Sequence, residues 1–152
     1  MDIISWQSEL ARLIALCLAE WHKNNQNIEI AMFCVDCHPW NGLLNLSILT
    51  QAELDQDQLL ADTDEMAAWK HFAFSAGYEF WAFSKALGIA MQHEYNLSTN
   101  SFATSEKYFY ACASAVAGEL VLPQLANMTQ SSSFKISVTN PDSHKEYYYS
   151  AS

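Results

Sequence analysis

Two cysteines and a histidine occur in this chain with the spacing that covalent haem attachment uses. The segment 34–38 reads CVDCH, a match to C-x-x-C-H, in which two thiols bond the haem vinyl groups and the histidine binds the iron. The same three side chains could instead ligate zinc, with Cys112 or His71 as the fourth ligand. This first candidate site therefore consists of Cys34, Cys37 and His38.

The context of this segment argues against ligation. Structural zinc sites normally include a second pair of closely spaced ligands, and the sequence has none. Residues 28–36 predict a strand, and if the strand continues, Cys34 and Cys37 point to opposite faces of it. We therefore interpret Cys34 as a core residue and His38 as part of a hairpin loop, and we expect no cofactor.

Carboxylates are concentrated in residues 51–65, which hold six of the 17 acidic residues and no Lys or Arg. An EF-hand calcium loop starting at Asp55 would need glycine and glutamate where the chain has Leu60 and Met66, so we exclude that site. Two interpretations remain, a solvated acidic loop and a docking surface for a basic partner. The carboxylates of the second interpretation are Asp55, Asp57, Asp62, Asp64 and Glu65.

The sequence motifs of common enzymes are missing from this chain. It contains no G-x-S-x-G, no P-loop, no G-x-G-x-x-G and no H-E-x-x-H. With only four glycines, it also lacks the material for a glycine-rich phosphate-binding loop. We predict that the protein is not an enzyme. The alternative is an enzyme of unrecognised type whose site forms only in three dimensions.

The net charge limits the classes of partner. The 152 residues carry a formal charge of −10 at pH 7, with Arg12 as the single arginine. Such a surface repels the phosphates of nucleic acids and the headgroups of anionic membranes, so we expect neither as a partner. The length fits one domain, which we expect to span residues 1–152, with 143–152 as a loosely ordered tail.

The N-terminal segment predicts an amphipathic helix over Ile3 to Trp21, because its apolar residues recur every three or four positions. Its continuous apolar run, Leu13 to Ala19, is too short to span a bilayer, and no excess of positive charge precedes it as in a secretory signal. We therefore expect a cytoplasmic protein whose cysteines are free thiols.

A pair of strands follows this helix. Residues 28–36 are apolar on both faces, which is typical of a central strand, and residues 43–50 predict a second strand. The short turn between them favours an antiparallel pair, because a parallel crossover needs a dozen residues or more. Trp40 lies in this turn, and we expect it to be exposed, as we expect for the tyrosines at 147–149.

The rest of the chain predicts two helices and a last strand. The helices cover 79–94, with Phe80 and Phe83 among its inward residues, and 106–122, which Pro123 ends or kinks. Residues 66–75 fit either a helical turn or a short strand, 96–105 form a polar loop, and 134–139 alternate as a strand. The expected fold class is α+β, with a small, mainly antiparallel sheet and about three helices packed on it.

The order of these segments is similar to that of a known group of proteins. An N-terminal helix leads to the strand pair, then to the Trp-bearing segment 69–72, two helices, and a strand that runs into residues 140–143. This order resembles that of small acidic bacterial proteins, some of them immunity proteins encoded beside polymorphic or contact-dependent toxins. The resemblance implies a stoichiometric binder whose acidic face blocks a basic, often nuclease, toxin. In that hypothesis, Trp40 or a tyrosine supplies the buried anchor.

Overall fold

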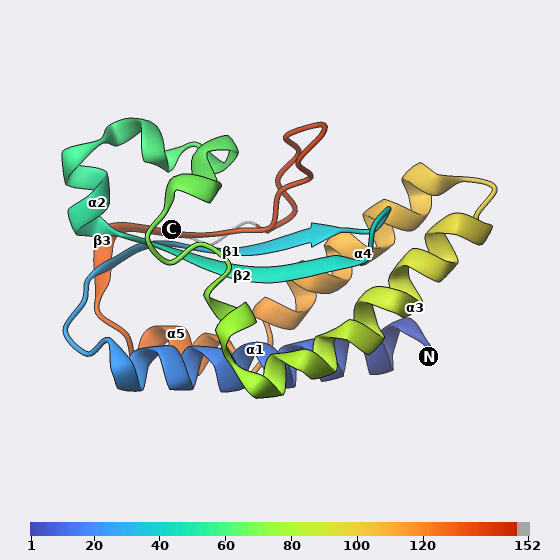
Figure 1. The fold of residues 1–152 in the computed structure, drawn as a ribbon, viewed down its shortest axis with the longest axis horizontal. Coiled ribbons are helices and arrows are strands. Elements are labelled where there is room, and N and C mark those ends of the chain that lie inside the picture. The colour runs from blue at the N-terminus through green and yellow to red at the C-terminus, as the bar shows by residue number, and fades with distance from the viewer. Residues whose placement is uncertain (149–152) are drawn as a thin grey trace.

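A computed structural model describes residues 1–148 and shows a three-stranded sheet between two unequal layers (Figure 1). Four helices lie over one face, and α2 with two 3-10 turns lies over the other. The helices are α1 (Ile3–Asn24), α2 (Gln51–Gln56), α3 (Ser84–Leu97), α4 (Ser101–Val116) and α5 (Leu122–Ala126). The 3-10 turns are η1 (Gln58–Ala61), η2 (Thr63–Ala68), η3 (Phe74–Gly77) and η4 (Glu79–Phe83). The predicted α+β class is confirmed.

Helix α1 covers the predicted segment and extends it by three residues. It begins at Asp2, whose carboxylate accepts a hydrogen bond from the backbone N–H of Ser5 at 2.8 Å. Its apolar stripe, which includes Trp6, Leu10 and Leu13, is fully buried and forms much of the main core. Among residues 1–148, no helix is both long enough and apolar enough to cross a membrane.

Strands β1 (Ile30–His38) and β2 (Leu43–Thr50) form the predicted antiparallel pair, with Cys34 opposite Ser47. The register shifts between Ile30 and Met32, which marks a bulge at Ala31. Because of this bulge, Ile30 faces the main core, whereas Met32 and Cys34 face the smaller cluster on the other side. Strand β1 is therefore covered on both faces, as its sequence predicts.

The third strand corrects the expectation of a mainly antiparallel sheet. Strand β3 (Gln130–Ser137) pairs with β1 in parallel, so the sheet is mixed and has the order β2-β1-β3. The chain returns through α4 and α5 to the end of the sheet where β1 begins, and Ile30 donates its N–H to the carbonyl of Thr129 at 2.8 Å. A strand that starts beside the first residue of β1 can only run in the same direction.

The helices after residue 78 differ from their predicted bounds. The segment 79–83 is the 3-10 turn η4. Because a 3-10 turn has three residues per turn, the residues that face the core differ from those of an α-helix. As a result, Trp81 is buried and Phe83 is 65% exposed, which corrects the inward placement of Phe83. Helix α4 begins earlier than expected because Asn100 caps it, and Pro123 lies in the first turn of α5 instead of ending α4.

Residues 66–75 combine both predicted alternatives. The 3-10 turn η2 ends at Ala68, and His71 then forms an isolated antiparallel bridge with Ile48 of β2, where the N–H of Ile48 donates to the carbonyl of His71 at 3.2 Å. This bridge and η3 cover the outer edge of β2.

The C-terminal segment folds back onto the domain. Glu146 bridges to Thr139, and Tyr147 is only 4% exposed, with its ring stacked on Phe109 at 5.0 Å between centroids. The tyrosine hydroxyl donates to Glu106 of α4 at 2.6 Å. Tyr147 is therefore a core residue, which corrects its expected exposure. Its neighbours Glu146 and Tyr148 are half-buried, residues 143–145 are exposed, and Tyr149 lies outside the described residues.

Candidate functional site

The acidic segment folds into ordered turns because its polar side chains cap them. The side chain of Thr50 accepts from the N–H of Glu53, whose carboxylate accepts in return from the N–H of Thr50, so a capping box starts α2. Asp57 and Asp62 start η1 and η2, each accepting from the N–H two residues further on at 3.0 and 2.9 Å. We call residues 51–68, which comprise α2, η1 and η2, the acidic layer.

Apolar contacts hold the acidic layer on the sheet. Leu54, Leu60 and Met66 point down from the layer onto a small buried cluster. The indole N–H of Trp69 donates to the carbonyl of Leu60 at 2.8 Å and ties the end of the layer to its middle. The cluster consists of Ala31, Met32, Cys34, Leu49 and Trp69.

The carboxylates of the acidic layer face solvent. All five carboxylates predicted to bind a partner are exposed, and they are distributed over α2, η2 and the residues that begin η1 and η2. Leu59 lies in their midst and is 75% exposed, an apolar side chain on an otherwise charged surface. The layer thus presents charge and one apolar residue together. The five carboxylates are those of Asp55, Asp57, Asp62, Asp64 and Glu65.

Glu53 has a different role from the other acids of the segment. One of its carboxylate oxygens accepts from the N–H of Lys70 at 2.7 Å, and the other accepts from the hydroxyl of Thr50 at 2.7 Å. Partial burial raises the pKa of Glu53, but these hydrogen bonds lower it by more, so its pKa lies below the ordinary value. Glu53 therefore stabilises the layer and is not part of the exposed set.

The exposed carboxylates lack strong counter-charges. Among residues 1–148, no Lys or Arg forms an ion pair with any of the five. The nearest basic group is His144, whose Nδ1 lies 3.7 Å from a carboxylate oxygen of Asp64, and Lys135 lines the same hollow as Asp62 without forming an ion pair with it. Because their charge is not neutralised, these carboxylates keep an attractive potential for a basic partner.

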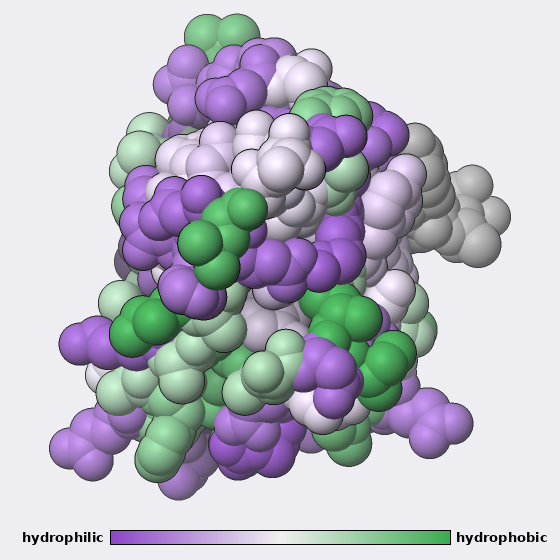
Figure 2. Space-filling model, turned by 90° about the vertical axis from the view of Figure 1, so that its right-hand side faces the viewer, coloured by the Kyte–Doolittle hydropathy of each residue, from purple (hydrophilic) through white to green (hydrophobic). Residues whose placement is uncertain are grey.

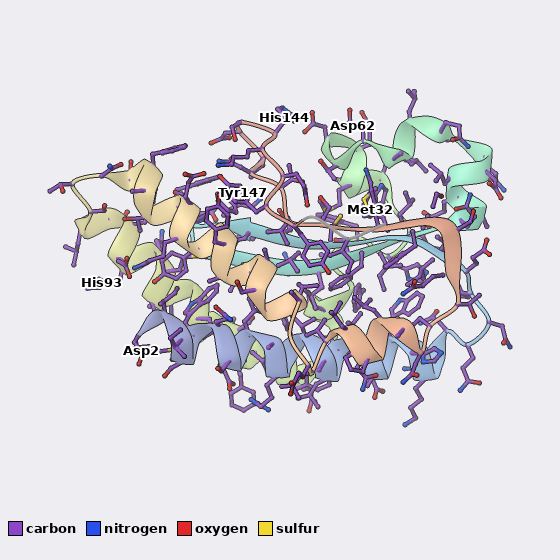
Figure 3. All side chains as sticks on the ribbon, turned by 180° about the vertical axis from the view of Figure 1, so that it is seen from behind. Asp2, Met32, Asp62, His93, His144 and Tyr147 are labelled. Carbon is purple, nitrogen blue, oxygen red and sulfur yellow. The ribbon has the colours of Figure 1, made fainter. Side chains whose placement is uncertain are left out.

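A groove runs between the acidic layer and the C-terminal segment. A cavity of about 210 Å³ lies beneath Asp64 and reaches Asp36 and His38, and a second hollow of about 490 Å³ lies between Asp62 and His144. Figure 3 shows Asp62 and His144 next to each other above the sheet, whereas Asp2 and His93 lie far from them. Thr63, Ser137 and Thr139 line both hollows, so these form one continuous depression.

The polar groups in this groove are hydrogen-bonded to one another. The Nε2 atom of His38 lies 2.7 Å from Asp36, and the hydroxyls of Ser137 and Thr139 donate to Glu146 at 2.8 and 2.5 Å. Within the described chain, His38 makes no hydrogen bond to a hydroxyl or thiol. A histidine base bonded to a hydroxyl or thiol is one common way in which a nucleophile is activated.

The structure separates the side chains of the C-x-x-C-H segment. Cys34 lies in the small cluster under the acidic layer, whereas Cys37 lies in the main core, with its Sγ 3.6 Å from the sulfur of Met91. Burial raises the pKa of both thiols above that of a free cysteine. His38 extends β1 by two residues beyond the predicted strand end and pairs with Asp36. Cys34 and Cys37 therefore cannot ligate one ion in this fold.

Trp40 lies far from most of the acidic layer. It is half-buried in the hairpin loop, with its ring 5.2 Å from that of His38, and its carbonyl accepts from the side chain of Gln92. The loop and α2 stand at opposite ends of the eight-residue strand β2, which spans about 25 Å. The structure thus does not bring Trp40 together with Asp55 and Asp57.

His71 lies between the acidic layer and the main core, and its half-buried ring makes a pH prediction possible. Its Nδ1 accepts from the indole N–H of Trp21 at 3.2 Å, and its Nε2 has no partner within residues 1–148. Burial lowers the pKa of His71 below 6.5 and outweighs the opposing effect of Glu53.

We expect the free energy of unfolding to decrease as the pH falls below about 6.5, because the unfolded chain protonates His71 more readily than the native chain does. In His71→Asn, whose amide oxygen can still accept from Trp21, this loss should be smaller. Urea unfolding at several pH values between about 7.5 and about 5.5, one unit on either side of the histidine pKa, measures it. His93→Gln is the exposed control and should retain the full loss. Equal pH dependence of both variants would contradict the role of His71.

Sequence reasoning did not find three residues of this region. Leu59 is an apolar residue within the acidic segment, and it fits neither the apolar spacing of a helix nor that of a strand. This mismatch could have indicated that Leu59 is exposed. His144 and Glu146 carry no such signal, because they reach the groove through a turn that begins about 80 residues after the acidic layer.

Comparisons with protein-family models, with curated proteins and with solved structures find no match to this chain.

Proposed function

We propose that this chain is a non-enzymatic protein-binding module whose acidic layer docks a basic partner. The most concrete form of this proposal is an immunity protein that neutralises a basic, nuclease-type toxin. The observation that carries it is a set of five exposed carboxylates without Lys or Arg partners, held on an ordered layer around an exposed leucine. Such a layer offers a partner charge at its rim and an apolar contact at its centre.

The rate of binding and the lifetime of the complex depend on different contacts. Exposed carboxylates attract a basic surface over distances of about 10 Å at 0.1 M salt and so raise the association rate. They add less to the lifetime of the complex, because charges at a wet rim are screened. The lifetime depends on desolvated contacts near the centre of an interface, a role that the position of Leu59 suits.

The test uses the protein encoded immediately upstream of this chain, purified in a catalytically inactive form. Association rates are measured by stopped flow from about 20 to about 500 mM salt, a range in which the screening length falls severalfold. We expect the rate to drop by at least about tenfold across this range. A rate that does not change with salt would overturn the acidic-layer mechanism, and failure to bind would overturn the immunity assignment.

Two matched variants separate the position of the charges from their number. The first neutralises the five carboxylates of the acidic layer with Asn and Gln, which keeps the caps at Asp57 and Asp62. The second neutralises five carboxylates elsewhere and therefore has the same net charge. We expect the first to bind at least about tenfold more slowly and the second to resemble the wild type. The second set is Asp2, Glu20, Glu79, Glu119 and Asp142.

A further inference from the structure

The outward face of α3 differs from the rest of this acidic chain. Residues 80–105 contain one lysine and one glutamate, Lys85 and Glu94, and Glu94 is already paired with Lys107 of α4. The same segment exposes large apolar side chains, among them Phe83 and Ile89, which is 67% exposed. Figure 2, which faces the end of the molecule where α3 meets α4, shows hydrophobic residues over its middle and lower parts. A neutral apolar surface thus lies on a chain of charge −10.

The exposed residues of this face follow a regular spacing. Alanines and larger apolar residues, with one histidine, recur at intervals of four, three, four and four residues from the end of η4 through α3, and all are exposed. This is the spacing by which one helix packs along another, and the alanines allow the two backbones to approach closely. The residues are Ala82, Ala86, Ile89, His93 and Leu97.

A groove lies directly beside this stripe. It has a volume of about 530 Å³, and its walls come from the start of β2 and from the segment 76–85. Glu79 and Lys85 stand on its rim with opposite charges. Ile89 projects one helical turn beyond Lys85, so an apolar side chain and an apolar groove are neighbours on one surface. The apolar part of the lining is Leu43, Leu44, Tyr78, Trp81 and Ala82.

We propose that this face binds a second copy of the chain, with α3 of each copy packed on α3 of the other about a two-fold axis. A two-fold interface requires a surface that complements itself. The face meets this requirement, because it has a projecting residue beside a groove and one charge of each sign at the rim. The near-neutral charge of this face keeps the local repulsion small where two chains of −10 would meet.

The position of α3 makes the dimer compatible with binding through the acidic layer. Helix α3 packs on the main core, whereas the acidic layer covers the opposite face of the sheet (Figure 1). Each acidic layer in the dimer therefore stays free and points away from the other. The dimer does not depend on the proposed function, and its failure would leave that proposal intact.

Sedimentation equilibrium of the wild-type chain tests the dimer. We expect a reversible dimer whose dissociation constant decreases from about 50 to about 500 mM salt, because salt screens the repulsion between the two chains. This is the opposite of the salt effect expected for a basic partner on the acidic layer. A monomer at every concentration and salt level would overturn the proposal.

Two variants with the same charge change identify the face. Ile89→Asp should weaken the dimer by at least about tenfold. Leu59→Asp, an equally exposed leucine on the acidic layer, should leave the dimer unchanged. Because both positions are exposed, both variants should fold, which thermal unfolding checks. A dimer that is equally stable in the two variants would show that another surface forms it, and would overturn the assignment to α3.

Discussion

Gly88→Ala is expected to destabilise the native fold by about 3 kcal/mol, because the new methyl group has no space. Its Cβ would lie 2.1 Å from the backbone carbonyl oxygen of Gly42. A backbone oxygen cannot rotate away as the end of a side chain can, so the hairpin loop and α3 must separate. The hydrogen bond from Gln92 to the carbonyl of Trp40 spans the same contact and would be lost as well.

Urea unfolding measures this loss, and the chain supplies its own control. Gly77 has no atom within 4 Å of the position that a Cβ would take, so Gly77→Ala should change the free energy of unfolding by no more than about 0.5 kcal/mol. Gly42 has a positive φ of 73°, which strains an alanine, and a Cβ at this position would lie 2.8 Å from the carbonyl oxygen of Gly88. Gly42→Ala should therefore also be destabilising. Equal stability of the Gly88 and Gly77 variants would refute this close packing.

Trp69→Ala is expected to release the acidic layer from the sheet. The indole is buried in the small cluster, and its N–H holds the carbonyl of Leu60, so truncation removes a large apolar group and a hydrogen bond at once. Truncation of a buried tryptophan typically costs about 3–5 kcal/mol. Because this cluster is separate from the main core, we expect the cost to fall chiefly on the layer, which should open while the rest stays folded.

Hydrogen exchange resolved by peptide locates this opening. In Trp69→Ala, the backbone amides of residues 57–69 should exchange much faster, and those of α1 and β1 should stay protected. Trp40→Ala is the control, because it removes a half-buried tryptophan at the hairpin loop and should leave exchange in the acidic layer unchanged. Uniform acceleration throughout the Trp69 variant would instead show that the layer and the main core unfold as one unit.

Elements defined by local pattern were predictable from the sequence. Helix α1 and the hairpin of β1 and β2 follow from apolar spacing and a short turn, and both occur close to their predicted bounds. The direction of β3 was not predictable, because it depends on where α4 and α5 return the chain. The exposure of Phe83 was missed for a local reason, since a 3-10 turn changes which residues face inward and leaves no mark in composition.

In the candidate site, too, the features that depend on local sequence were predictable, and those that depend on distant contacts were not. A run of carboxylates without Lys or Arg predicted an exposed charged surface, and the five carboxylates are indeed exposed. That this segment covers a sheet depends on contacts with residues 31–49, and that it forms one wall of a groove depends on residues 137–146, far along the chain. The placement of Trp40 away from α2 follows from the length of β2, which separates the two ends of the hairpin.

The parallel pairing of β1 with β3 has a consequence for folding during synthesis. The two strands are about 100 residues apart in the chain, so one edge of the apolar strand β1 has no strand beside it until residues 130–137 have left the ribosome. Contacts of such long range are slow to form, and open strand edges promote association between chains. At elongation rates of about 5–20 residues per second, β1 waits several seconds for β3. A nascent chain stalled before residue 130 is therefore the state most prone to aggregate.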